Sequence, residues 1–148
     1  MGRSGIINFQ GRTIGGISGI YSKFKYSSPR TFEDYYYRDK DVDLLYTLEN
    51  AQIDLFVSHD WPQNIVFYGN MEELLNVKPF LRHEVSIGEF GSPPLYKLLH
   101  ILKPKYWFAA HMHVFYKATY GPTQFVALNK NSRHGGWLHV KQLIHFFR

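Results

Sequence analysis

Residues 53–62 read IDLFVSHDWP, an apolar run that ends in a short polar cluster and a proline. A run of four to eight apolar residues bounded by turn-forming residues is typical of a strand buried inside a sheet. Pro62 has no backbone N–H to donate, so a hydrogen-bonded ladder cannot continue through it. The stretch therefore predicts a buried strand over residues 53–57, with His59 just beyond its carboxyl end.

A second stretch further along the chain has the same arrangement. Residues 106–114 read YWFAAHMHV, which predicts another buried strand over residues 106–110. Successive side chains of a strand point to opposite faces, so His111 and His113 are expected to point the same way. Ligands of α/β sheets bind outside the carboxyl ends of the strands. If the two strands are neighbours, His59 joins these two histidines at one rim.

Three histidines at one rim are candidate metal ligands. Imidazole is the commonest metal ligand in proteins, because its neutral nitrogen lone pair is available near neutral pH. The alternative is a set of exposed histidines at strand ends that bind nothing. No metal role is expected for the remaining histidines, which are His83, His100, His134, His139 and His145.

The rest of the chain predicts a single α/β domain over residues 1–148. Ser92 is a favourable N-cap and Pro93 a favourable first helical residue, so a helix is expected from there to Leu102. Residues 63–90 are expected to be irregular, apart from one helical turn at 72–76. The other expected elements are a hairpin of strands 5–9 and 12–18 turning at Gln10-Gly11, a helix at 41–50, strands at 114–119 and 124–128, and a last strand at 137–145.

The composition limits the function classes. The chain has 148 residues, no cysteine, a net charge of +5 and 18% aromatic residues. Disulfides and thiolate metal sites are excluded. No apolar run approaches the roughly 18 residues of a membrane span, so no membrane partner is expected. Basic and aromatic side chains together favour a polyanionic partner such as nucleic acid.

Several segments resemble one enzyme family. Ser58-His59-Asp60-Trp61-Pro62 resembles a signature of the RNA lariat debranching enzymes, which belong to the calcineurin-like metallophosphoesterase superfamily. Further similar segments follow in the family's order and at similar spacings. They are IGGISGI at residues 14–20, GSPP at 91–94, KPKYWFAAHMHV at 103–114 and FVALNK at 125–130.

The resemblance implies a metallophosphoesterase-type β-sandwich flanked by helices, and hydrolysis of the 2′–5′ phosphodiester at the branch point of lariat RNA. It also implies two divalent metal ions, with Fe, Zn and Mn fitting the donors almost equally. By motif, His59 and His111 would hold one metal and His113 the other. The implied location is the nucleus, with the cytoplasm as a second compartment.

The sequence departs from the family at its N-terminal side. The family has an Asp-x-His or Cys-x-His element, a Gly-Asp that supplies a bridging carboxylate, and a Gly-Asn-His-Glu that supplies an Asn ligand and a catalytic His. None of these motifs is present. Tyr68-Gly69-Asn70-Met71-Glu72 is not a displaced copy, because Met71 stands at the catalytic position. No catalytic residue is therefore expected within the chain; these groups would lie upstream of Met1. The sandwich is expected to be incomplete and this partial copy inactive alone.

Residues 21–40 stand where the family carries its substrate-recognition loop. Cations and aromatics alternate there, which suits a kinked RNA. The alternative is a solvated loop with some tyrosines packed inward. The candidate RNA-binding residues are Ser18, Gly19, Lys23, Tyr36, Tyr37 and Arg38.

Three functions remain open from the sequence. The first is a piece of an active debranching enzyme, arising from a truncated gene model or a split protein. The second is a non-catalytic remnant or RNA-binding module, and the third is a metallophosphoesterase for another phosphodiester. Loss of the family's N-terminal strands would leave an unpaired edge beside strands 53–57 and 106–110. The missing N-terminal half or a second copy is therefore an expected partner, unless the chain's own hairpins close the sheet.

Overall fold

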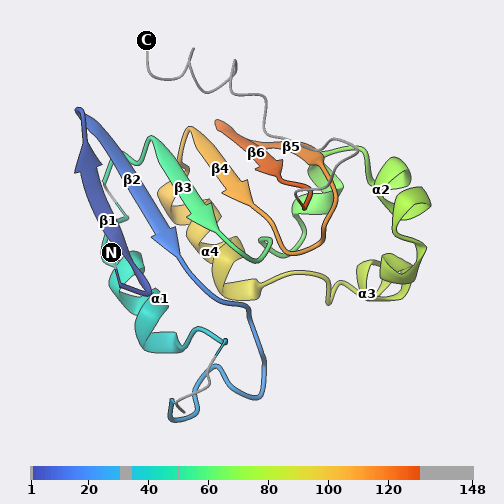
Figure 1. Cartoon of the computed structure of the whole chain (residues 1–148), viewed down its shortest axis with the longest axis horizontal. Coiled ribbons are helices and arrows are strands. Elements are labelled where there is room, and N and C mark those ends of the chain that lie inside the picture. The colour runs from blue at the N-terminus through green and yellow to red at the C-terminus, as the bar shows by residue number, and fades with distance from the viewer. Residues whose placement is uncertain (1, 31–34, 50, 131–148) are drawn as a thin grey trace.

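The computed structural model describes residues 2–30, 35–49 and 51–130. They form a six-stranded sheet with four α-helices and two short 3-10 helices (Figure 1). The strands are β1 (Ser4–Phe9), β2 (Arg12–Ile17), β3 (Leu55–Ser58), β4 (Tyr106–Ala109), β5 (Tyr116–Tyr120) and β6 (Thr123–Ala127). The helices are α1 (Asp39–Tyr46), η1 (Ile65–Tyr68), α2 (Met71–Val77), η2 (Pro79–Leu81), α3 (Arg82–Ser86) and α4 (Pro93–Leu102).

The sheet is mixed, in the order β1-β2-β3-β4-β6-β5. Its four central strands, β2, β3, β4 and β6, run parallel, and each outer strand is the antiparallel partner of a neighbour. The carboxyl ends of β2, β3 and β4 therefore lie at one rim of the sheet (Figure 1).

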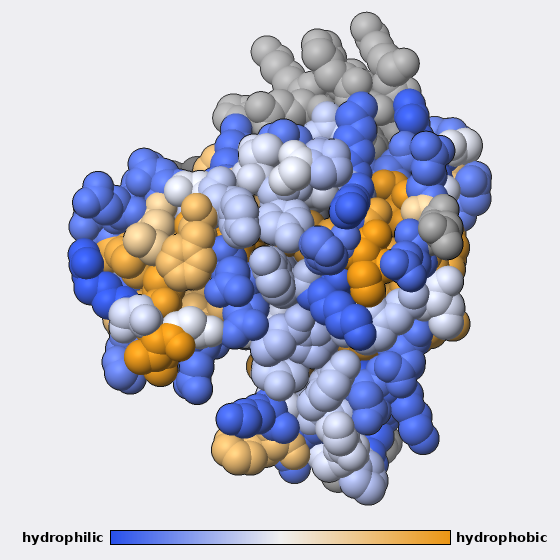
Figure 2. All heavy atoms as spheres, turned by 180° about the vertical axis from the view of Figure 1, so that it is seen from behind, coloured by the Kyte–Doolittle hydropathy of each residue, from blue (hydrophilic) through white to orange (hydrophobic). Residues whose placement is uncertain are grey.

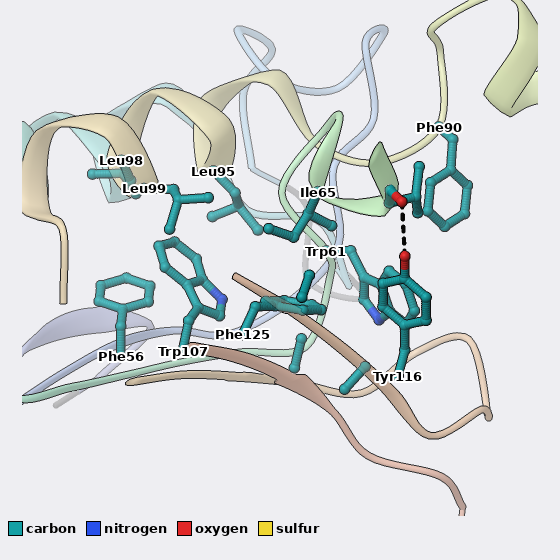
Figure 3. Close-up of a cluster of buried hydrophobic side chains, with 14 of the residues drawn as sticks. Phe56, Trp61, Ile65, Phe90, Leu95, Leu98, Leu99, Trp107, Tyr116 and Phe125 are labelled. Atoms are coloured by element: carbon teal, nitrogen blue, oxygen red, sulfur yellow. Dashed lines mark hydrogen bonds between the residues drawn. The ribbon is translucent and has the colours of Figure 1, made fainter. Parts of the chain in front are cut away.

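The core lies between one face of the sheet and the helices. Phe56, Trp107 and Phe125 point from the sheet toward the leucines of α4, and all three are at most 1% exposed (Figure 3). The neighbouring residue Val57 points to the opposite face and is 43% exposed. No helix of the described residues covers that face (Figure 1). The described residues thus form one sheet with helices on one side, which confirms the α/β class.

The outer surface on the helix side is mostly hydrophilic. Figure 2 shows apolar side chains gathered over the segment that contains α2 and α3. The exposed apolar residues of this segment and the preceding η1 are Phe67, Tyr68, Val77, Phe80 and Ile87.

Most predicted elements are confirmed. The hairpin turns at Gln10 and Gly11, both at positive φ, and the Ser92 hydroxyl accepts a hydrogen bond from the Leu95 N–H as an N-cap should. Residues 63–90 are more ordered than predicted, because they contain α2 and α3. The predicted strand at 137–145 lies outside the described residues. Among the helices described, none has the length and apolar character needed to span a membrane.

The predicted unpaired edge beside β3 and β4 is wrong. β3 pairs with β2 and β4, and β4 pairs with β3 and β6, so both have hydrogen-bonded neighbours on each side. The hairpins β1-β2 and β5-β6 close the sheet at its two sides. Association with another chain stays a prediction, but these two strands do not provide an edge for it.

Candidate metal centre

Two of the three predicted histidines lie side by side at the carboxyl ends of neighbouring strands. The His59 and His111 rings stack with centroids 4.9 Å apart and planes inclined by 25°. The strand ends are tied directly, because the Ala110 N–H donates to the His59 carbonyl at 3.0 Å. His113 is exposed and close enough for its charge to lower the pKa of His59. The structure thus brings His59 and His111 together at one rim, and His113 follows two residues later in the chain.

The backbone at His111 and His113 is strained, and both residues follow the end of β4 at Ala109, so the strand alternation predicted for them does not apply. His111 has φ of 58° and His113 has φ of 49°, in the left-handed region that residues with a Cβ seldom adopt. Between them, the Met112 N–H turns back to the Ala110 carbonyl at 2.7 Å. Such conformations cost on the order of 1–3 kcal/mol and concentrate at functional sites. Two successive candidate ligands in this state favour a functional role over a set of idle strand-end histidines.

The two sequence signatures hold each other in place. Ser58 Oγ accepts a hydrogen bond from Trp107 Nε1 at 2.9 Å and donates to the Asp60 carbonyl at 2.6 Å. In the opposite direction, Trp61 Nε1 donates to the Ala110 carbonyl at 2.7 Å. The serine and the tryptophans of these signatures therefore fix the positions of the histidine-bearing turns.

Asp60 is a site residue that sequence reasoning missed. Its carboxylate is nearly buried and accepts hydrogen bonds from the backbone N–H groups of Tyr21 and Trp61, both at 2.9 Å. Its Oδ1 lies 3.5 Å from His111 Nδ1, a buried nitrogen with no hydrogen-bond partner. A carboxylate facing one imidazole nitrogen fixes the ring orientation and leaves Nε2 for a metal. The signal was available, because Asp60 stands between His59 and Trp61 in the signature.

The surroundings of His59 favour its neutral imidazole. Partial burial lowers the pKa of His59 from its usual value, and the charges of His111 and His113 lower it further, against the opposite effect of the Asp60 carboxylate. Burial raises the pKa of Asp60, against the effect of its hydrogen bonds and of His111. A histidine with a lowered pKa keeps its nitrogen lone pair at neutral pH, as a metal ligand must.

The donor set fits part of a metal centre. The stacked His59 and His111 imidazoles supply nitrogen donors of the kind that a nitrogen-ligated metal requires, with Asp60 facing Nδ1 of His111. Within residues 2–30, 35–49 and 51–130, no three His, Cys, Asp or Glu side chains come together closely enough to hold a metal ion.

A hollow of about 410 Å³ lies beside His59. Two of the predicted RNA-binding residues, Ser18 and Gly19, line it together with His59. Of its other lining residues, Arg3 and Ile20 were not predicted to bind RNA and Tyr35 belongs to the predicted loop. Nothing near Arg3 in the sequence marks it, since only the pairing of β1 with β2 brings it to this rim.

Tyr37 and Arg38 are buried, so their side chains are removed from contact with a ligand in solution. Tyr37 is 0% exposed and hydrogen-bonds to the Ser92 hydroxyl. Arg38 is 3% exposed and donates to the carbonyls of Ser28 and Tyr36. The burial of Tyr37 agrees with the alternative of tyrosines packed inward, whereas the burial of Arg38 was not predicted. Lys23 is exposed and Tyr36 is half-buried, so both stay candidates for RNA contact.

The loop over residues 21–40 is anchored to the rim at its base. The Ile20 N–H donates to the Tyr35 carbonyl at 3.0 Å, and the Tyr37 N–H donates to the Ile20 carbonyl at 3.3 Å. The start of the loop is also fixed to the signature by the bond from the Tyr21 N–H to Asp60. Its ends therefore meet beside the histidines.

Gly19→Ala is expected to destabilise this junction. Gly19 has φ of +96°, and an added Cβ would lie 2.6 Å from the Tyr35 carbonyl oxygen, a backbone atom that cannot swing aside. We expect a loss of about 2–3 kcal/mol in the free energy of unfolding, measured with urea. Gly121→Ala is the matched control, because Gly121 has φ of +54° with open space around its Cβ position. Equal losses in the two variants would contradict the steric explanation.

Sequence comparison finds lariat debranching enzymes from several organisms. No protein-family model matches the chain. The lariat debranching enzyme of Homo sapiens is 36% identical over 166 residues, covering 98% of this chain and 30% of that enzyme. The enzyme of Schizosaccharomyces pombe is 45% identical over 129 residues, covering 80% of this chain and 27% of that enzyme. The Arabidopsis thaliana enzyme is 40% identical over 146 residues, covering 88% and 35%.

A solved structure shows a similar fold. TT1561 of Thermus thermophilus matches with a TM-score of 0.55 and 15% identity, over 84% of this chain and 47% of that one. The chain spans about a third of the length of the curated relatives that it matches. Over nearly its whole length, the chain is homologous to the lariat debranching enzymes.

Proposed function

We propose that this chain supplies the histidine side of a two-metal phosphodiesterase that cleaves the 2′–5′ branch of lariat RNA. The observation that carries the proposal is the stacked His59–His111 pair, with one histidine in each segment that resembles a family signature and with His111 on strained backbone. The relatives' names support the reaction class, and the basic, aromatic loop beside the histidines supports an RNA substrate.

The proposed centre gives a distinct role to each of the three histidines and to Asp60. His59 and His111 would hold one metal, His113 would hold the other, and Asp60 would keep the His111 ring oriented. Fe, Zn and Mn all suit such donors. A divalent metal pair would supply neutralisation of charge at the reacting phosphate. Tyr21, Tyr35 and Tyr37 of the segment 21–40 are hydrogen-bonded at this rim, and the proposal gives this segment the task of positioning the branched RNA.

The remaining groups of the centre come from outside this chain in the proposal. They are the bridging carboxylate, the Asn ligand and the catalytic His of the family's N-terminal motifs. The coverage supports this division, because the chain aligns with 30% of the human enzyme. A bridging carboxylate is needed because two divalent ions a few ångströms apart repel strongly.

The chain alone is therefore expected to leave branched RNA intact. The test is incubation of the 148-residue chain with branched RNA and Mn²⁺ or Fe²⁺, with the Schizosaccharomyces pombe enzyme as the positive control. Metal-dependent release of linear RNA that disappears in His111→Ala would contradict the proposed division of the site. Metal-independent, tight binding of branched RNA without cleavage would favour an RNA-binding module. Cleavage of a simple phosphodiester without cleavage of branched RNA would favour a metallophosphoesterase for another substrate.

A further inference from the structure

We propose that the surface over α2, α3 and the start of β5 is a docking site for another protein, which binds there with a segment of apolar and cationic side chains. This apolar-acidic surface consists of Glu73, Val77, Phe80, Glu84, Ile87 and Phe115. The inference does not rest on the proposed function, because none of these residues belongs to the histidine site.

The apolar-acidic surface exposes several large apolar side chains that gather in one part of the molecule (Figure 2). Phe80 is 72% exposed, Val77 is 60% exposed and Ile87 is 52% exposed. Apolar side chains that gather in one exposed patch commonly mark an interaction site, whereas scattered single ones need no explanation. The patch therefore favours a partner that removes these side chains from water.

A small pocket of about 220 Å³ opens in this surface, between α2 and the start of β5. Val77 and Phe115 line it, and so do the buried side chains of Leu74 and Val114. Glu73 is at the same pocket, where its carboxylate accepts a hydrogen bond from Asn70 Nδ2 at 3.0 Å. Residues that dominate the binding energy of protein interfaces commonly fill such pockets. The pocket is therefore expected to take one apolar anchor of the partner.

The charge of this surface favours a cationic partner. Residues 63–90 contain four acidic and two basic residues, a net charge of −2 in a chain whose net charge is +5. Glu73 lies four residues before Val77 in α2, so the two share a helix face, and Glu84 lies three residues before Ile87. Among the residues that the structure describes, neither carboxylate is in an ion pair. RNA and anionic membranes would meet like charges here, which leaves a basic protein segment as the occupant.

NMR titration of the full chain with synthetic peptides tests the inference. The probe is an amphipathic peptide of leucine and lysine, with its leucines at helical spacing. Two matched peptides have glutamate in place of every lysine, or serine in place of every leucine. We expect the leucine-lysine peptide to shift the signals of Val77, Phe80, Ile87 and Phe115, and to bind at least about 10-fold more tightly than either matched peptide.

Substitutions separate the apolar and the charged contributions to binding. Val77→Ser together with Phe80→Ser is expected to weaken binding of the leucine-lysine peptide by about 5- to 30-fold. Glu73→Gln together with Glu84→Gln is expected to weaken it by about 2- to 10-fold and to reduce its dependence on salt. All four side chains are exposed, so both variants are expected to stay folded, which the dispersion of their remaining NMR signals checks.

The matched control carries Phe24→Ser and Glu49→Gln, which replace an exposed aromatic and an exposed carboxylate elsewhere on the chain. We expect it to bind the leucine-lysine peptide as the wild type does. Wild-type affinity in the Val77→Ser and Phe80→Ser variant, or equal affinity for the leucine-glutamate peptide, would overturn the inference. The same signals shifted by oligouridylate, by phosphatidylserine vesicles or by raising the protein concentration alone would also overturn it, in favour of RNA, a membrane or a second copy.

Discussion

Trp61→Ala is expected to lower the free energy of unfolding by about 3–5 kcal/mol, the usual cost of removing a large buried aromatic side chain. Trp61 is 0% exposed, stacks on Tyr116 at 5.3 Å between ring centroids, and meets the rings of Phe90 and Phe125 edge-on (Figure 3). Its indole N–H also holds the Ala110 carbonyl, the last residue before the strained histidine turn.

This expected decrease is a large part of the free energy of unfolding of a typical domain, which is roughly 5–15 kcal/mol. Urea unfolding of the purified variant measures it. Trp61→Phe separates the two contributions, because it keeps a buried ring and removes the indole N–H. We expect about 0.5–1.5 kcal/mol for that variant, since the Ala110 carbonyl loses the indole N–H and keeps the hydrogen bond from the Met112 N–H. Phe24→Ala serves as the control, because Phe24 is 88% exposed and its loss is expected to cost little. A Trp61→Ala variant as stable as this control would contradict the packing described.

Asp60→Asn is expected to weaken metal binding at His111 by about 10- to 100-fold, as loss of a carboxylate behind a metal-bound histidine commonly does. The carboxylate Oδ1 faces His111 Nδ1 at a distance of 3.5 Å. An asparagine has one acceptor oxygen where the aspartate has two, and both Asp60 oxygens already serve backbone N–H groups. The amide of this variant therefore cannot accept both backbone hydrogen bonds and also orient the His111 imidazole.

Isothermal titration of the chain with Zn²⁺ measures this effect. Asp54→Asn is the matched control, since Asp54 accepts hydrogen bonds from Arg12 and from the Thr13 N–H but precedes β3 rather than following it. We expect the control variant to bind Zn²⁺ as the wild type does. Equal affinity in Asp60→Asn and Asp54→Asn would show that the carboxylate behind His111 has no part in holding the metal.

The strands and helices that depend on residues close together in the chain were predictable from the sequence. The apolar runs before His59 and His111 predicted β3 and β4, and the Ser92-Pro93 pair predicted the start of α4. The parallel neighbours were required for the histidines to share a rim, and β3 and β4 do pair over Leu55–Val57 and Tyr106–Phe108. Hydrophobic periodicity and helix capping depend on residues a few positions apart, so a single sequence is enough to predict them.

The rest depends on contacts between distant segments. Arg3 reaches the hollow through its bonds to Ser18, and the pairing that brings them together is not encoded in either residue's neighbours. Tyr37 and Arg38 have the composition of an RNA-binding loop, yet the fold buries them against Ser92 and the Ser28 carbonyl. Asp60 gains its role only once His111 lies beside it. Sequence patterns predicted the residues at the rim, and tertiary packing decided which side chains are available.

A fusion protein tests most directly whether these histidines serve a debranching centre. The segment of the Schizosaccharomyces pombe enzyme that precedes its match to this chain is joined to Met1, because that relative is 45% identical over the matched region. Branched RNA and Mn²⁺ are added, and release of linear RNA is measured for the fusion, for its His111→Ala variant and for its His100→Ala variant. His100 is an exposed histidine of α4 bonded to Tyr120. We predict metal-dependent debranching by the fusion and by His100→Ala, and none by His111→Ala. A folded fusion that leaves the branch intact, or a His111→Ala variant that cleaves it equally fast, would contradict the proposed role of the rim.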